Sequence, residues 1–123
     1  MPGCTYDALL KAMREKAAID PNARWAVSVV FLISEQKISR DLKWFLTHCD
    51  ATTPRIDWKA ILGEGTWSVT EKSILQAAAV LSGDNRMIIY LDQVGQRLSG
   101  WHVDVFYSML EARNTQRVPE KYL

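Results

Sequence analysis

The residues with the most reactive side chains form a short run, Thr47-His48-Cys49-Asp50. A cysteine becomes a catalytic nucleophile when a histidine activates it and a carboxylate orients that histidine. His102 and Asp104 could fill these two roles if the fold brings them to Cys49. However, no local signature surrounds Cys49, and a free cysteine commonly behaves as a small buried apolar side chain. We therefore expect a protein without catalytic activity, with a ligand pocket or enzyme centre built around Cys49, His48 and His102 as the alternative.

The same residues are poor candidates for a metal site. Structural zinc usually needs four cysteine or histidine ligands, and the chain has four in total, scattered at positions 4, 48, 49 and 102. Neighbouring residues on a helix point in different directions, so His48 and Cys49 do not readily converge on one ion. The sequence predicts no metal and no cofactor.

Gly63-Glu-Gly65 leads into a helix start, where free backbone N-H groups can hold an anion. The P-loop and dinucleotide-binding patterns are both missing, and Glu64 and Glu71 would repel an anion there. Ser68 and Glu71 instead match a capping box, in which two side chains satisfy the first N-H groups of a helix. We interpret the glycines as a helix stop and a turn, and the direction in which Trp67 points stays open.

Residues Gln96 to Ala112 have the outline of a helix-turn-helix, with Ser-Gly between two predicted helices. Its second helix has no Arg or Lys between Trp101 and Ser108, and Asp104 carries the wrong charge for DNA. The whole chain has a formal charge of only +1. Nucleic-acid binding is therefore the third and least favoured hypothesis.

Tryptophan is abundant, with five in 123 residues. Trp44 falls outside the apolar stripe of its predicted helix, and Tyr107 falls outside that of the last helix. Partner surfaces concentrate Trp and Tyr, so Trp44, Trp101 and Tyr107 are the candidate partner-binding residues. The alternative is that these rings wrap a small core. We expect a protein-protein interaction or accessory regulatory module, with self-association as a homodimer one form of it.

Helical periodicity predicts most of the elements that must position these residues. One apolar stripe runs through 5–18, and Asp20-Pro21 is typical of a helix start. The apolar run Trp25–Ile33 is predicted to be a buried helix, with a strand as the alternative. Further helices are predicted at 35–48, 57–63 (from a cap at Asp57 to a stop at Gly63), 68–83, 87–98 and 101–113, with a loop at 50–54.

Composition and length indicate a single ordinary domain. The chain is 48% hydrophobic and 24% charged, which is typical of globular proteins. The longest apolar run is far below the roughly 20 residues of a membrane helix, and two cysteines without a signal segment favour a cytoplasmic setting. We predict an all-α fold, a compact orthogonal bundle of five to six helices at 1–113, followed by an irregular tail at 114–123. An α+β fold would follow if Trp25–Ile33 were a strand.

Overall fold

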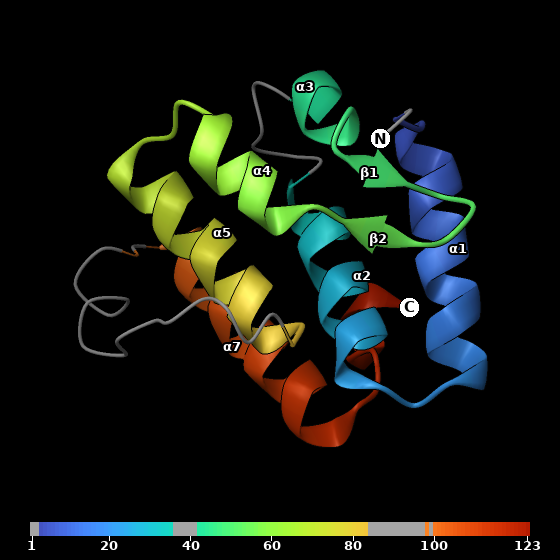
Figure 1. Cartoon of the computed structure of the whole chain (residues 1–123). Coiled ribbons are helices and arrows are strands. Elements are labelled where there is room, and N and C mark those ends of the chain that lie inside the picture. The colour runs from blue at the N-terminus through green and yellow to red at the C-terminus, as the bar shows by residue number, and fades with distance from the viewer. Residues whose placement is uncertain (1–2, 36–41, 84–97, 99) are drawn as a thin grey trace.

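The computed structural model describes residues 3–35, 42–83, 98 and 100–123. This part of the chain is mostly helical, which confirms the predicted fold class, and it contains one small two-stranded sheet (Figure 1). Its elements are α1 (Tyr6–Ile19), α2 (Ala23–Glu35), α3 (Leu42–Leu46), β1 (Cys49–Asp50), β2 (Arg55–Ile56), α4 (Trp58–Glu64), α5 (Val69–Leu81), α7 (Trp101–Thr115) and a 3-10 turn, η1 (Glu120–Tyr122).

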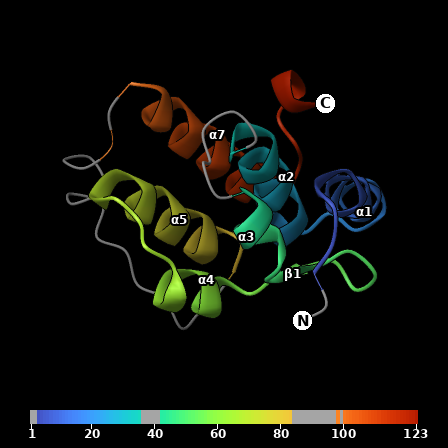
Figure 2. The same cartoon turned by 90° about the horizontal axis from the view of Figure 1, so that it is seen from above.

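Helix α2 is the centre of the packing. It lies between α1 on one side and α5 and α7 on the other (Figure 2) and contacts all three helices. Every residue from Ala26 to Leu32 is buried, with Phe31 among the largest fully enclosed side chains. The run Trp25–Ile33 is therefore a helix, and the strand alternative is wrong. The run from Ala26 to Leu32 is apolar except for Ser28, as expected of a helix segment that is enclosed by other helices.

The start of α2 differs from the prediction. The side-chain oxygen of Asn22 accepts from the backbone N-H of Arg24 at 2.9 Å, so Asn22 caps the helix and the cap predicted at Asp20 is wrong. Asp20 still belongs to the end of α1, where its N-H donates to the carbonyl of Lys16. Its carboxylate is used elsewhere, since it accepts from the indole N-H of Trp25 at 3.0 Å.

The ends of α4 and α5 follow side-chain caps. Asp57 caps α4 through the N-H of Ala60 at 3.2 Å, as predicted. The stop predicted at Gly63 is wrong, because α4 continues to Glu64 and is capped by Gly65. Both hydrogen bonds of the capping box between Ser68 and Glu71 are present at the start of α5.

Trp67 packs inward, which answers the question left open by the sequence. Its indole N-H donates to the carbonyl of Ile61 at 2.8 Å, within the last turn of α4. A Cβ on Gly65 would overlap this indole and lie 2.8 Å from the Ile61 oxygen. The glycine is therefore needed for the close approach of Trp67.

The loop predicted at 50–54 is part of a β-hairpin: Asp50 ends the first strand, and residues 51–54 form the turn. β1 and β2 pair antiparallel, with Cys49 opposite Ile56 and Asp50 opposite Arg55. The hairpin lies across one end of α1 and α2 (Figure 1). The antiparallel pairing fixes the direction of β2 and of Thr53 and Pro54, which precede it.

Two predicted helices lie partly or wholly outside the described residues. The ends of the helix predicted at 35–48 are wrong, because Glu35 is the last residue of α2 and α3 covers only Leu42–Leu46, followed by a turn. Of the segment 87–98 only Leu98 is described. The last helix runs to Thr115, two residues beyond its predicted end. The division into a domain at 1–113 and a tail stays a prediction. Within that tail, Tyr122 packs against the core and its carbonyl accepts from Arg14 at 3.5 Å. Among the described residues, the helices are too short and too polar for any to cross a lipid bilayer.

Candidate ligand-binding pocket

A pocket of about 520 Å³ opens where the hairpin, the first turns of α2 and the end of α5 meet. Its volume lies within the roughly 300–1,000 Å³ of small-molecule sites. Five parts of the chain supply the eleven lining residues: Met13; Arg24, Trp25 and Ser28; Thr53, Pro54, Arg55 and Ile56; Trp58; Ser82 and Gly83.

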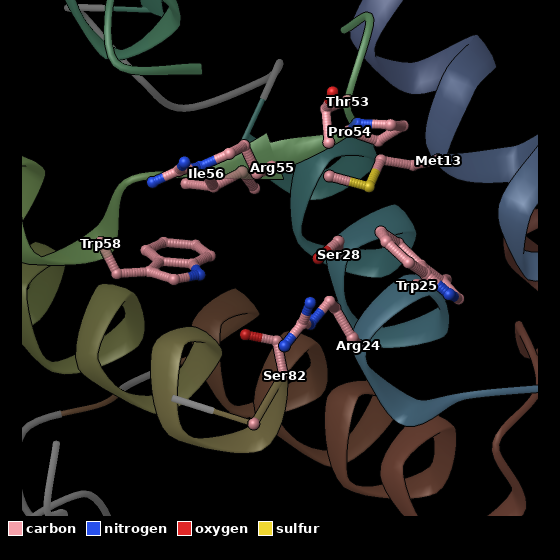
Figure 3. A pocket seen from close by; sticks show the side chains of 11 residues that line it. Met13, Arg24, Trp25, Ser28, Thr53, Pro54, Arg55, Ile56, Trp58 and Ser82 are labelled. Atoms are coloured by element: carbon pink, nitrogen blue, oxygen red, sulfur yellow. The ribbon is translucent and has the colours of Figure 1, made fainter. Parts of the chain in front are cut away.

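The charged side chains of the lining are all cationic. Arg24 comes from α2 and Arg55 from β2, so the two guanidinium groups stand on different walls (Figure 3). Within the part of the chain that the structure describes, no Asp or Glu lines the pocket. Over the described ranges, the one ion pair within 4.0 Å is that of His48 with Glu64, so neither arginine is neutralised by a carboxylate there. The two guanidinium groups remain available to an anion.

Each tryptophan of the lining is held by contacts outside the pocket. The Trp25 indole N-H is bonded to Asp20, and the guanidinium carbon of Arg24 lies 5.7 Å from the Trp25 ring centroid. This is a cation-π distance, so Arg24 is placed beside an aromatic wall. Trp58 is only 6% exposed and meets the ring of Phe31 edge to face at 5.1 Å. Both indoles are therefore pre-positioned.

Three hydroxyl groups complete the lining. Ser28 and Ser82 are buried, and Thr53 is exposed at the mouth. The Ser82 hydroxyl donates to the carbonyl of Ala79 at 3.1 Å, leaving its oxygen lone pairs as acceptors. A hydroxyl rotates to suit its partner, so these residues offer both donors and acceptors to a ligand.

Cys49 has the surroundings of a structural thiol. It is fully buried in β1, and its thiol donates to the carbonyl of Phe45 at 3.4 Å. Burial, with a smaller contribution from Cys4, strongly raises the pKa of the Cys49 thiol. Because the thiolate is the nucleophile, this environment opposes the catalytic role considered above.

His48 and His102 have separate neighbours. His48 lies against the Trp44 ring at 4.5 Å, and its Nε2 is 3.7 Å from the Glu64 carboxylate. His102 lies on α7, where burial lowers its pKa and the charge of Glu71 partly offsets that effect. The Nε2 of His102 is buried and has no hydrogen-bond partner within the described ranges. His48, His102 and Cys49 are not among the lining residues. The pocket is therefore not the ligand or enzyme site that the sequence offered as an alternative around these three residues.

The described residues do not form a metal site. Across residues 3–35, 42–83, 98 and 100–123, no group of three His, Cys, Asp or Glu side chains is arranged to hold an ion.

The three candidate partner-binding residues lie in two regions. Trp44 is half-buried and packs edge to face on Trp67 at 5.8 Å, so it belongs to the surface layer around α4. Trp101 and Tyr107 lie on α7 and are 38% and 64% exposed. Their role in partner binding stays a prediction.

No protein-family model matches the chain, and neither curated proteins nor solved structures show a significant similarity to it. Function must therefore be argued from the geometry of the site.

The sequence does not predict this pocket, because its lining residues come together only through the hairpin. Arg24-Trp25 and Arg55-Ile-Asp-Trp58 each place an arginine near a tryptophan, and both residue types are enriched at the hot spots of protein interfaces. That repeated pairing was the available signal. The sequence alone does not show that the two Arg-Trp segments line one pocket, because that depends on the antiparallel pairing of the strands on either side of residues 51–54.

Proposed function

We propose that the protein is a non-catalytic binding protein for a small organic anion, held in the pocket between α2, the hairpin and α5. The observation that supports this is the pair of guanidinium groups, Arg24 and Arg55, in a lining whose described residues include no carboxylate. Guanidinium binds carboxylate and phosphate through charge-assisted, often bidentate hydrogen bonds. A cytoplasmic setting, with both cysteines free, is part of the same proposal.

Binding is favoured over catalysis by the chemistry of the lining. The lining residues that the structure describes include no His, Cys, Asp, Glu or Lys, so none of them can act as a general base for Ser28, Ser82 or Thr53. An unactivated hydroxyl is a weak nucleophile. The hydroxyls of Ser28 and Thr53 are suitable as hydrogen-bond donors to an anionic oxygen, whereas the Ser82 hydroxyl already donates to Ala79.

The test is isothermal titration calorimetry of the full chain with phenyl phosphate, in wild type and in Arg24→Gln and Arg55→Gln. A charge-assisted hydrogen bond contributes about 1.5–3 kcal/mol, and solvent screening of these exposed arginines reduces that value. We expect each substitution to weaken binding about tenfold.

Arg117→Gln is the matched control, because Arg117 is exposed in the tail and is not a pocket residue. Equal affinity of wild type and both pocket variants would contradict the proposal. Weaker binding at higher salt is expected in addition, since the arginines are reached by solvent.

Protein-protein interaction through α7 is a second candidate, favoured by the 64% exposure of the Tyr107 ring. Rings of this size at interfaces contribute strongly to affinity. If α7 mediates self-association, light scattering coupled to size exclusion will show a dimer that Tyr107→Ala shifts to monomer. A wild-type chain that remains monomeric at all accessible concentrations would rule out the homodimer.

A further inference from the structure

We infer that the anion bound by this pocket is carried by an aromatic ring, so that the ligand class is a small aryl carboxylate or aryl phosphate. The inference rests on the proposed anion binding and deepens it. It adds a statement about the uncharged part of the ligand, which the two arginines alone do not specify.

The size of the pocket requires a ligand with an organic body. An inorganic anion bound at the arginines would leave most of the 520 Å³ without contacts. Five lining residues have apolar side chains, which supply a surface for that body: Met13, Trp25, Pro54, Ile56 and Trp58. Sites for small organic molecules have this combination of apolar walls and a few polar groups.

The two indoles favour an aromatic body over an aliphatic one. Trp25 comes from α2 and Trp58 from the start of α4, on different walls of the pocket (Figure 3). Aromatic rings attract one another edge to face or in offset stacks, beyond the effect of buried area. Trp58 already makes such contacts with Phe31 at 5.1 Å and Phe45 at 6.1 Å, so its orientation is fixed before a ligand arrives.

The position of Arg24 places the anionic group of a ligand close to an aromatic wall of the pocket. Its guanidinium carbon lies 5.7 Å from the Trp25 ring centroid, so an anionic group bonded to Arg24 is next to an indole. The remainder of the ligand then extends along the Trp25 wall toward Ser28, which is on the same helix one turn later. A charged group attached directly or by one carbon to a planar ring fits this spacing.

The test compares matched ring systems by calorimetry: phenylacetate against cyclohexylacetate, and phenyl phosphate against inorganic phosphate. Aromatic pairing predicts that phenylacetate binds about three- to tenfold more tightly than cyclohexylacetate. Inorganic phosphate is expected to bind more weakly than phenyl phosphate, because it makes no contact with the apolar walls.

Trp25→Leu probes the wall itself, since Trp25 is half-buried at the edge of the core whereas Trp58 is inside it. The variant should bring the affinities for phenylacetate and cyclohexylacetate close together, and Trp25→Phe should restore most of the difference. Val69→Ala, at the opposite end of α5 from Ser82, is the control and should keep the wild-type ratio.

The outcomes separate this inference from the proposed function. If cyclohexylacetate binds as tightly as phenylacetate, the aromatic inference is overturned and anion binding stands. If inorganic phosphate equals phenyl phosphate, the organic body has no role and the inference also fails. If none of the four probes binds at millimolar concentration, both proposals are wrong.

Discussion

Arg24 and Arg55 show how single residues acquire a role from their neighbours. Both are exposed and neither has a carboxylate partner among the described residues, which is ordinary for surface arginines. They line one pocket, and the guanidinium carbon of Arg24 lies 5.7 Å from the Trp25 ring centroid. An anion in this pocket can contact guanidinium groups from two walls at once, whereas an isolated surface arginine offers only one.

Two neighbouring glycines, Gly63 and Gly65, lead to opposite predictions for stability. A Cβ at Gly65 would overlap the Trp67 indole, so Gly65→Ala should displace that ring and break its hydrogen bond to Ile61. We expect a loss of about 2 kcal/mol in the free energy of unfolding. Urea denaturation measures it.

Gly63→Ala is the matched control. Gly63 lies inside α4, and apart from its chain neighbours and the backbone of its own helix, no described atom lies within 4 Å of the position that an alanine Cβ would take there. Alanine should therefore stabilise the protein by about 0.5–1 kcal/mol. Equal effects of the two substitutions would show that Trp67 does not pack on Gly65.

At the scale of elements, helix caps that depend only on residues close in sequence were predicted correctly. The box of Ser68 and Glu71 and the cap at Asp57 depend on residues three apart, and both appear in the structure. Gly83 has a positive φ of 103°, as expected of a glycine that ends a helix. Such features need no knowledge of the rest of the fold.

Signals that depend on distant residues were predicted less well. Asp20 and Asn22 both suit a helix start, and the choice follows from the bond between Asp20 and Trp25. Gly63 resembles a stop, but the approach of Trp67 places the end of α4 at Gly65. In each case a tryptophan several residues away decides where the helix begins or ends.

The pocket was the least predictable feature for the same reason. The two-residue strands β1 and β2 are too short to give an alternating pattern, so the sequence showed only a turn rich in Thr and Pro. The hairpin nevertheless places Pro54, Arg55 and Ile56 against α2. The chemically reactive residues of the sequence, His48, Cys49 and His102, lie outside the pocket.

At the scale of the molecule, the pocket concentrates charge on a nearly neutral chain. The formal net charge is +1, yet the charged groups among the described lining residues are two arginines and no carboxylate. Local rather than total charge therefore guides an anion to this face. The buried helix α2 carries Arg24, Trp25 and Ser28, so one rigid element supplies a large part of the site.

The most direct test of anion binding in this pocket is a two-dimensional NMR titration of the full chain with phenyl phosphate. We predict saturable shifts that are largest at the amides of Ser28, Ile56 and Gly83 and at the Trp25 indole N-H. The double variant R24Q/R55Q should remove them. Shifts centred on α7 around Trp101 and Tyr107, or shifts that persist in the double variant, would contradict anion binding at this site.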